Sequence, residues 1–254
     1  MIKTVIIDYL PERAACYLRE HTIIAVDVVR ATTTAISAVA AGRRCFPVPT
    51  VEAALELADR LGNVLLVGEQ KGIKPPGFDL NNSPVQLLAR TDIERPVVLL
   101  SSSGTRLCHK AAKSHATFLA CLRNYASVAS HIAVTCNFPK VAVIGAGNRG
   151  EFREEDQMCC AWIAERLLGA GYLPEDGETA DIVKRWSKAP VNAWTFGKSA
   201  AYLRRSGQTE DLDFILRKIA DLNAPFMLRN GEVVTCDPVS NTHEPVMDAQ
   251  RSYQ

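Results

Sequence analysis

The sequence lacks the long apolar run that a membrane-spanning helix requires. Such a helix needs about 18 consecutive apolar residues, whereas the longest runs here, at residues 96–100 and 141–146, have the length of a strand. The N-terminal segment also reaches Asp8 too early for the apolar core of a secretory signal peptide. These absences predict a soluble, cytoplasmic protein with no membrane partner.

The sequence has almost no net charge. Its 29 lysine and arginine residues nearly balance its 28 aspartate and glutamate residues, so no protein-wide field favours nucleic acid as a partner. Hydrophobic residues make up 47% of the chain and charged residues 22%, which is typical of a globular protein with a sizeable core and excludes general disorder.

The patterns of metal-binding and disulfide-rich scaffolds are missing as well. The eight cysteines contain no C-x-x-C pair, and the five histidines show no paired-ligand spacing. Most cysteines, Cys16 among them, stand in apolar segments, which predicts reduced core residues. The chain has no P-loop motif, and Asp27 lacks the second aspartate of a D-x-D phosphatase motif.

Short β-branched segments alternate with helical patterns along the first 170 residues. Strands are predicted at residues 4–8, 22–28, 45–48, 64–68, 96–100, 116–119 and 140–145, and helices at 31–41, 51–61, 105–113, 124–134 and 154–168. The strands lack strict polar alternation, as expected of strands covered on both faces. The alternation predicts an α/β protein, with a three-layer α/β/α fold and a mixed, largely parallel sheet.

The last third of the chain has a different pattern. Helices are predicted at residues 179–186, 197–205 and 211–222, followed by a final strand pair around Gly231 and a polar tail. We therefore expect one domain, residues 1–254, with an α/β core at 1–172 and a mainly helical addition with the tail at 173–254.

Hydroxyl groups and arginines gather where the predicted strands end. In an open α/β sheet, ligands bind beyond the carboxyl ends of the strands. Helix N-termini there offer free N–H groups, and arginines add forked cationic donors, so converging junctions would form an anion-binding pocket. The candidate anion-binding residues are Arg30, Thr32, Thr33, Thr34, Ser102, Ser103, Thr105, Arg106, Asn148 and Arg149.

Carboxylates stand among these groups. They would repel an anionic ligand unless a cation lay between them, and Mg²⁺ takes carboxylate oxygens together with substrate phosphate and water. The candidate metal ligands are Asp27, Glu69 and Asp156, with Asp79 and Glu154 as substitutes.

Other interpretations of the same residues remain open. The hydroxyl residues can serve as helix caps, and the acidic residues 154–156 can complement a helix dipole. The turn from Gly145 to Gly150 matches G-x-G-x-x-G, so a nicotinamide-dependent oxidoreductase is one alternative, although no acid ends a second strand at the expected distance. A non-catalytic protein that binds a small anion is the other.

At these junctions the sequence resembles the 2-phosphosulfolactate phosphatase family. The resemblance is carried, in order along the chain, by the motifs DVVRATTT at residues 27–34, GFDLNNSP at 77–84, SSSGTR at 101–106 and GAGNRG at 145–150. It implies a phosphoric monoester hydrolase of coenzyme M biosynthesis, which uses Mg²⁺ to convert (R)-2-phospho-3-sulfolactate into 3-sulfolactate and phosphate.

We assign roles to these residues on this basis. Asp27 and Arg149 are the predicted catalytic residues, with Arg149 on the reacting phosphoryl group and Arg106 on the non-reacting sulfonate. Metal-activated water is favoured over a phospho-aspartate on Asp27, because no neighbouring D-x-D arrangement supplies an acid/base partner. Lys198, in the helical addition, is expected to matter little. The predicted partner is a small phosphorylated acid, and a homodimer is compatible with the size of the chain.

Overall fold

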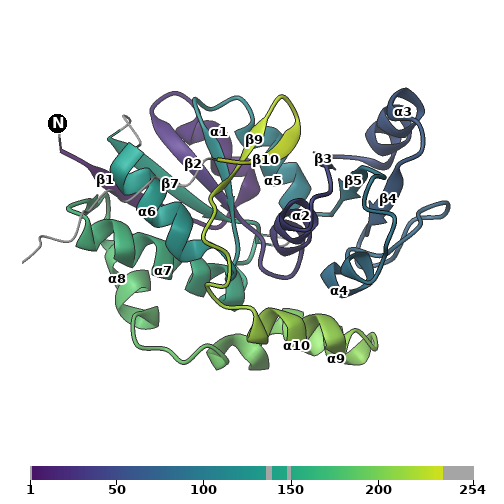
Figure 1. Ribbon diagram of the computed structural model, residues 1–254. Coiled ribbons are helices and arrows are strands. Elements are labelled where there is room, and N and C mark those ends of the chain that lie inside the picture. Colours follow the sequence, from purple (N-terminus) through teal and green to yellow (C-terminus); the bar gives the residue numbers. More distant parts are fainter. Residues whose placement is uncertain (1, 136–138, 148–149, 237–254) are drawn as a thin grey trace, which may run out of the picture.

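A computed structural model describes residues 2–135, 139–147 and 150–236, and these residues form one ten-stranded sheet with helices on both faces (Figure 1). The three-layer α/β/α fold with a mixed, largely parallel sheet is thereby confirmed. The strand order is β4-β5-β3-β10-β9-β6-β2-β7-β1-β8. The strands are β1 (Thr4–Asp8), β2 (His21–Val26), β3 (Cys45–Val48), β4 (Leu65–Gly68), β5 (Val97–Leu100), β6 (Thr117–Ala120), β7 (Lys140–Gly145), β8 (Leu173–Pro174), β9 (Phe226–Arg229) and β10 (Glu232–Thr235).

Helix ends follow the capping signals of the sequence. The Thr50 side chain accepts a hydrogen bond from the N–H of Ala53 at the start of α3, and Gly62 ends that helix with φ 64°. Ser83 caps α4 in the same way, with Pro84 in its first turn. The described helices are α1 (Ala14–Tyr17), α2 (Ala31–Ala40), α3 (Val51–Leu61), α4 (Pro84–Leu88), α5 (Gly104–Ala111), α6 (Tyr125–Thr135), α7 (Glu154–Gly169), α8 (Gly177–Trp186), α9 (Lys198–Arg205) and α10 (Thr209–Arg217), with short 3-10 helices η1 (Pro11–Arg13) and η2 (Ala193–Phe196).

The hairpin β9–β10 occupies the middle of the sheet. Strands β3, β5 and β4 are parallel to one another on one side, and β6, β2, β7, β1 and β8 are parallel on the other. The hairpin pairs antiparallel with β3 and with β6 and so joins the two parallel sections. The strand pair expected around Gly231, in the otherwise mainly helical segment 173–236, thus lies in the middle of the sheet.

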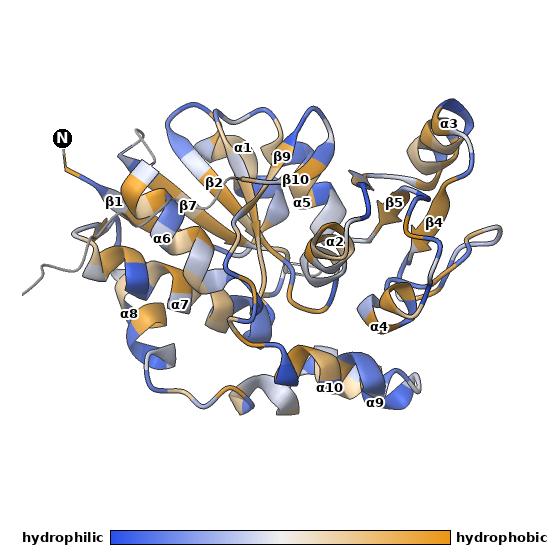
Figure 2. Ribbon diagram, in the orientation of Figure 1, coloured by the Kyte–Doolittle hydropathy of each residue, from blue (hydrophilic) through white to orange (hydrophobic). Residues whose placement is uncertain are grey.

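Both faces of the central strands are buried, which explains why these strands lack polar alternation. In β2, Ile24 and Val26 belong to the cluster that includes α6, α7 and α8, whereas Ile23 and Ala25 belong to the one that includes α1, α2 and α5. A smaller cluster lies under α3. Figure 2 shows hydrophobic colour along the central strands and mainly hydrophilic colour along α9.

The described helices and cysteines bear on two expectations from the sequence. In the described part of the chain, no helix combines the length and apolar character needed to cross a bilayer. The seven described cysteines form no disulfide, and five of them are buried. Cys16 is exposed, so its prediction as a core residue was wrong: α1 buries Ala14 and Tyr17 and turns Cys16 outward.

Candidate active site

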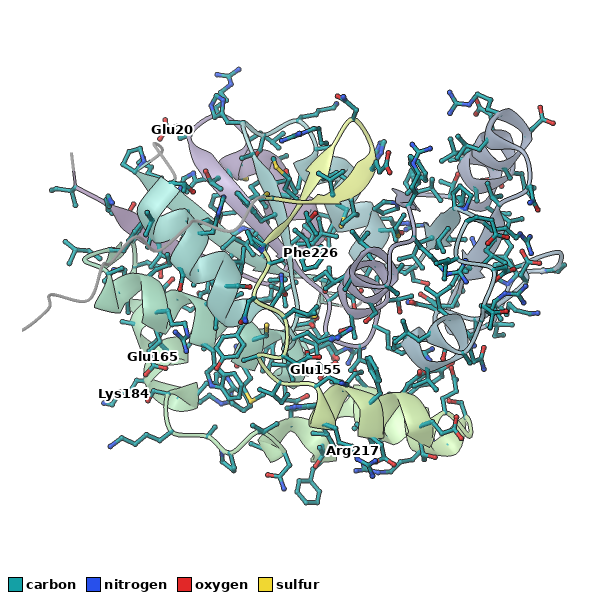
Figure 3. All side chains as sticks on the ribbon, in the orientation of Figure 1. Glu20, Glu155, Glu165, Lys184, Arg217 and Phe226 are labelled. Carbon is teal, nitrogen blue, oxygen red and sulfur yellow. The ribbon has the colours of Figure 1, made fainter. Side chains whose placement is uncertain are left out.

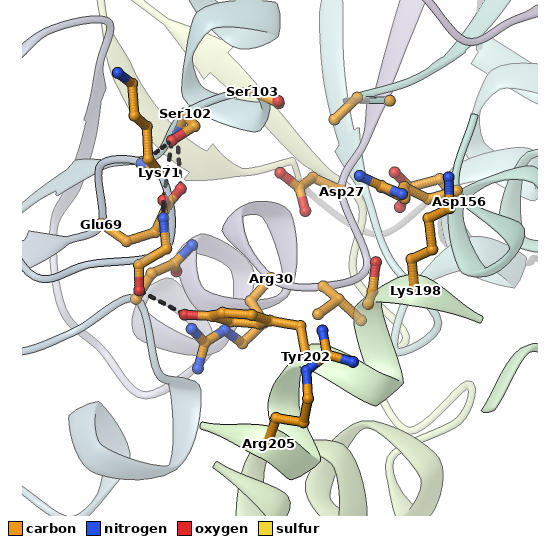
Figure 4. A pocket seen from close by; sticks show the side chains of 17 residues that line it. Asp27, Arg30, Glu69, Lys71, Ser102, Ser103, Asp156, Lys198, Tyr202 and Arg205 are labelled. Atoms are coloured by element: carbon orange, nitrogen blue, oxygen red, sulfur yellow. Dashed lines mark hydrogen bonds between the residues drawn. The ribbon is translucent and has the colours of Figure 1, made fainter. Parts of the chain in front are cut away.

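The carboxyl ends of β2, β4, β5 and β7 border one cavity of about 510 Å³, and α9 forms the wall facing them (Figure 4). Both parallel sections of the sheet therefore contribute to a single site. The lining residues are Asp27, Val29, Arg30, Glu69, Lys71, Gly72, Asn82, Ser102, Ser103, Ala146, Gly147, Arg153, Asp156, Lys198, Ser199, Tyr202 and Arg205.

Asp27 is the residue directly after β2, and it is buried. Backbone N–H groups of Ala31 and Gly104, at the starts of α2 and α5, donate hydrogen bonds to its carboxylate. The positive ends of two helix dipoles thus meet one side chain. Burial nevertheless raises the pKa of Asp27 to about 6, and the negative charge of Glu69 adds to this rise.

Asp156 and Glu155 are buried neighbours in the first turn of α7 (Figure 3 marks Glu155). The N–H of Val28 donates to Asp156 Oδ1 at 2.7 Å, which attaches α7 to the loop after β2. Burial raises the pKa of Asp156 well above its ordinary value, and Asp27 and Glu155 raise it further.

Glu155, next to Asp156, has one carboxylate oxygen that accepts no hydrogen bond in the described structure. Burial raises the pKa of Glu155 to about 7, although the side chain of Ser199 forms a hydrogen bond with the carboxylate. Within the described structure, Oε2 of Glu155 has no hydrogen-bond partner. A buried oxygen of this kind is costly while it is charged, so the site favours a nearby cation or a proton.

Glu69 belongs to the other parallel section of the sheet. Its carboxylate accepts hydrogen bonds from the N–H of Ser102 at 2.7 Å, from the hydroxyl of Ser102 at 2.9 Å and from the N–H of Gly72 at 2.6 Å. These bonds join the loops after β4 and β5. Figure 4 shows Glu69 across the cavity from Asp156, with Asp27 between them.

The carboxylates do not form a closed metal cage. Among the described residues, no three His, Cys, Asp or Glu side chains gather closely enough to hold an ion between them. Asp27 and Asp156 are nevertheless two mutually repelling buried carboxylates on one cavity. Mg²⁺ commonly uses one or two carboxylates and completes its shell with water and substrate oxygens, so this pair fits such an ion.

The substitute ligands lie elsewhere. Asp79 accepts a hydrogen bond from the N–H of Leu66 at 2.8 Å and does not line the cavity. Glu154 also lies outside the lining, with its carboxylate against Gly197 at the start of α9. Of the five candidate metal ligands, the cavity brings together Asp27, Glu69 and Asp156.

The threonine hydroxyls point into the backbone instead of the cavity. Thr32 Oγ1 donates toward the carbonyls of Asp27 and Ala120, and Thr33 Oγ1 donates to Val28. Thr105 forms reciprocal hydrogen bonds with Ser101. These hydroxyls, and the buried Thr34, do not line the cavity. Their expected role as ligands is not supported. The backbone already uses the hydroxyls of Thr32, Thr33 and Thr105, and the Thr34 hydroxyl is buried without a hydrogen-bond partner in the described structure.

The three arginines predicted to bind the anion differ in where they lie relative to the cavity. Arg30 is buried and lines the cavity, but its guanidinium pairs with Asp211 of α10 and donates to Gln208 at 2.6 Å. Arg106 is exposed on α5, outside the cavity lining, because that helix buries the residues on either side of it. Arg149, like Asn148, lies outside the described residues. Ser102 and Ser103 do line the cavity.

Arg153 is a cavity residue that the sequence motifs did not mark. It is the N-cap residue of α7, and its Nη1 is buried without a hydrogen-bond acceptor in the described structure. Its ion-pair contact is with Glu151, whose Oε2 lies 3.9 Å from Nη1. A buried cationic donor that is not hydrogen-bonded and borders a cavity is suited to an anionic ligand.

The residues of α9 were missed as well, and Lys198 was expected to be peripheral. Lys198, Ser199, Tyr202 and Arg205 all line the cavity. Their pattern in the sequence is that of any amphipathic surface helix, so no local signal marked them. Only the packing of residues 193–217 across the strand ends places them there.

The glycine turn has a structural explanation. Gly147 has φ 51°, and a Cβ atom there would lie 2.2 Å from the carbonyl oxygen of Tyr9. The turn is therefore required by close packing against the loop after β1. Buried Glu155 and Asp156 occupy the following helix start, where the pyrophosphate of a dinucleotide would lie.

Most of the chain is similar to one group of known proteins. The family model described as 2-phosphosulpholactate phosphatase matches residues 9–224. A probable 2-phosphosulfolactate phosphatase of Thermus thermophilus is 34% identical, over 90% of this chain and 96% of that protein. The protein of the same description in Deinococcus radiodurans is 35% identical over 82% and 88% of the two chains, and that of Clostridium beijerinckii is 29% identical over 87% and 93%.

Proposed function

The chain belongs to the 2-phosphosulfolactate phosphatase family, and from this premise we propose that it hydrolyses the phosphate monoester of a small polyanionic acid. The first-choice substrate is (R)-2-phospho-3-sulfolactate, which would yield 3-sulfolactate and phosphate. The descriptions of the relatives support this choice of substrate.

The observation that carries the proposal is the mixture of charges in the cavity. The buried carboxylates Asp27 and Asp156 border the same space as Arg153, whose buried Nη1 has no acceptor in the described structure. A protein that only binds an anion gains nothing from buried carboxylates beside the ligand, because like charges repel. Hydrolysis of a phosphate ester with the help of a divalent cation needs both kinds of group.

We propose that Asp27 and Asp156 hold Mg²⁺, with Glu69 also at the strand ends, across the cavity from Asp156. Bound Mg²⁺ supplies positive charge at the phosphate oxygens and makes water more acidic. Backbone groups of the chain orient both carboxylates toward this role. The N–H groups of Ala31 and Gly104 position Asp27, and the N–H of Val28 positions Asp156.

Arg153 and Glu155 complete the proposal. The guanidinium of Arg153 would donate hydrogen bonds to the phosphoryl oxygens and stabilise the charge that develops there during transfer. Glu155 can hold a proton near neutral pH, because burial raises its pKa to about 7. A protonated Glu155 would reduce the negative charge beside Asp156 while an anionic substrate enters.

The experiment is phosphate release from a panel of esters, with added Mg²⁺ and after treatment with a chelator. The panel contains (R)-2-phospho-3-sulfolactate, 2-phospholactate and p-nitrophenyl phosphate. We expect Mg²⁺-dependent release that is fastest for the sulfonated ester. Binding of these anions without turnover would favour the anion-binding alternative. Oxidation of a 2-hydroxy acid with NAD would favour the oxidoreductase alternative.

Three sequence predictions belong to the same proposal. We propose a place in coenzyme M biosynthesis, a cytoplasmic location and a homodimeric assembly. Accumulation of the phosphorylated substrate in a deletion strain, cell fractionation and light scattering on the purified protein test them in turn.

A further inference from the structure

Helix α9 presents one polar face to the cavity. Lys198, Tyr202 and Arg205 line it at spacings of four and three residues, which places their side chains on the same side of a helix. Two contacts hold this face against the loops opposite. Tyr202 Oη donates to the carbonyl of Gly72 at 2.5 Å, and Lys198 Nζ lies 2.5 Å from Glu151 Oε2.

Among the described residues, Arg205 is the cation of this face that has no partner. Lys198 is paired with Glu151, and Arg30, on the facing wall, is paired with Asp211. Arg205 takes part in none of the hydrogen bonds or ion pairs formed by the described residues, and it lines the cavity. Figure 4 shows its guanidinium extending from α9 toward the middle of the cavity, below Asp27.

The charges of the cavity are separated in space. The carboxylates that suit a metal and a phosphoryl group stand at the strand ends, whereas Arg205 comes from the opposite wall. In a 2-phospho-3-sulfo acid the carboxylate is attached to the carbon that bears the ester oxygen, and the sulfonate lies one carbon further away. The sulfonate is thus the acidic group that can extend furthest from the reacting phosphorus.

We propose that Arg205 is the specificity-determining residue that binds the sulfonate of the substrate. This inference rests on the proposed function, since it assumes that the phosphoryl group lies at the strand ends. The forked guanidinium suits the oxygens of a sulfonate, and the sulfonate stays ionised at every pH in which the protein is folded. Tyr202 and Lys198 hold the helix that carries this residue.

The test compares two substrates that differ only in the sulfonate. For Arg205→Gln we expect kcat/KM with (R)-2-phospho-3-sulfolactate to fall roughly 10- to 100-fold. With 2-phospholactate, which lacks the sulfonate, it should stay within about twofold. Arg205→Lys should recover only part of the loss, because lysine lacks the fork. Equal losses on both substrates, or no loss on either, would overturn the proposal.

Arg204→Gln is the matched control. It removes the same charge from the adjacent position of α9, but its side chain donates to the carbonyl of Thr195 and does not line the cavity. We expect its kinetics with both substrates to match those of the wild type. A loss specific to the sulfonated ester in this variant would point to the general charge of α9 and would overturn the assignment to Arg205.

The wild-type activity separates this proposal from the proposed function. If the wild type hydrolyses neither ester, the proposed function fails, and calorimetry with 3-sulfolactate and lactate then decides the role of Arg205. The inference holds if the wild type binds 3-sulfolactate more tightly than lactate and Arg205→Gln abolishes that difference. It is overturned if the variant retains it.

Discussion

The two walls of the cavity hold their charged side chains in different ways. On the strand-end wall, Asp27 and Asp156 are buried, and backbone N–H groups donate hydrogen bonds to them, from two helix starts for Asp27 and from the loop after β2 for Asp156. On the α9 wall, Lys198 and Arg205 are exposed, and the helix is attached through long side chains. The carboxylates are thus fixed by short backbone contacts, whereas the cations of α9 are carried by an element packed over the strand ends.

The two walls also differ in energetic cost. Burying Asp27, Glu155 and Asp156 together disfavours their charged forms, and hydrogen bonds offset only part of this cost, so a cation or bound protons would relieve it further. Exposed cations on α9 cost little, because water solvates them. We therefore expect changes on the strand-end wall to affect both catalysis and stability, and changes on the α9 wall to affect mainly substrate preference.

The largest effect is expected for Asp27→Asn. The change preserves size but removes the charge that we assign to metal binding, so kcat should fall about 10³-fold or more while the fold is preserved. Phosphate release and a thermal unfolding curve measure the two quantities. Asp59→Asn, an exposed change on α3, is the control and should be neutral. Near-normal turnover of Asp27→Asn at saturating Mg²⁺ would reduce Asp27 to a structural residue.

Arg153→Gln comes next and sharpens the contrast with Arg205. If Arg153 binds the phosphoryl group, its loss should lower kcat/KM roughly 10- to 100-fold for every substrate, because all of them share the reacting group. Kinetics on the sulfonated and unsulfonated esters measure this. A loss confined to the sulfonated ester would mean that Arg153 binds the sulfonate, and would contradict its assignment to the phosphoryl group.

Gly104→Ala tests the geometry of the strand-end wall. A Cβ atom at residue 104 would lie 2.1 Å from Asp27 Oδ2 and 2.7 Å from Ala31 Cβ, so the carboxylate or helix α2 must shift. We expect a loss of about 1–3 kcal/mol in the free energy of unfolding, measured with urea, together with reduced turnover. Gly177→Ala is the control, since a Cβ there meets nothing within 4 Å. If Gly104→Ala had the stability and turnover of the wild type, the carboxylate of Asp27 would have room to move, and its tight placement would be contradicted.

Stability against pH tests the cost of the buried carboxylates. The pKa values of Asp27 and Glu155 in the folded protein, about 6 and about 7, lie above their ordinary values of 3.8 and 4.5. Between these limits the folded state binds more protons than the unfolded state. The free energy of unfolding of the metal-free protein should therefore fall as pH rises from about 4 to about 7.

Glu155→Gln should reduce the total fall in the free energy of unfolding over this pH range by on the order of 1–2 kcal/mol, after relaxation around the site. Urea unfolding at a series of pH values measures the slope. Added Mg²⁺ should stabilise the wild type more at pH 8 than at pH 5, because the carboxylates are then charged. An unchanged slope in the variant would mean that Glu155 carries no such cost in the folded protein.

Tyr202→Phe should have the smallest effect. It removes the hydrogen bond to Gly72 but preserves the ring, so α9 loses one of its two attachments to the facing loops. We expect KM for the sulfonated ester to rise about threefold with little change in kcat. A fall in kcat with an unchanged KM would contradict a role of this contact in substrate binding.

Local patterns in the sequence predicted most of the elements, since β1, β3, β7 and α3 have the expected bounds. They also placed Asp27 and Glu69 directly after buried strands, and both residues line the cavity, although β2 and β4 lie on opposite sides of the antiparallel hairpin β9–β10. The patterns did not predict the orientation of side chains at helix starts. A hydroxyl there can cap the turn or contact a ligand, and Thr32 and Thr105 are used by the turn.

The sequence by itself determined the α/β alternation, the capped helices and the acidic residues at the strand ends, because these depend on contacts within a few residues along the chain. Only the tertiary structure decided the central place of β9–β10, the outward position of Arg106 and the arrival of α9 at the cavity. These features depend on packing between segments that lie far apart in the sequence. Arg205 resembles any surface arginine until α9 packs against the loop after β4, and that long-range contact places it at the cavity.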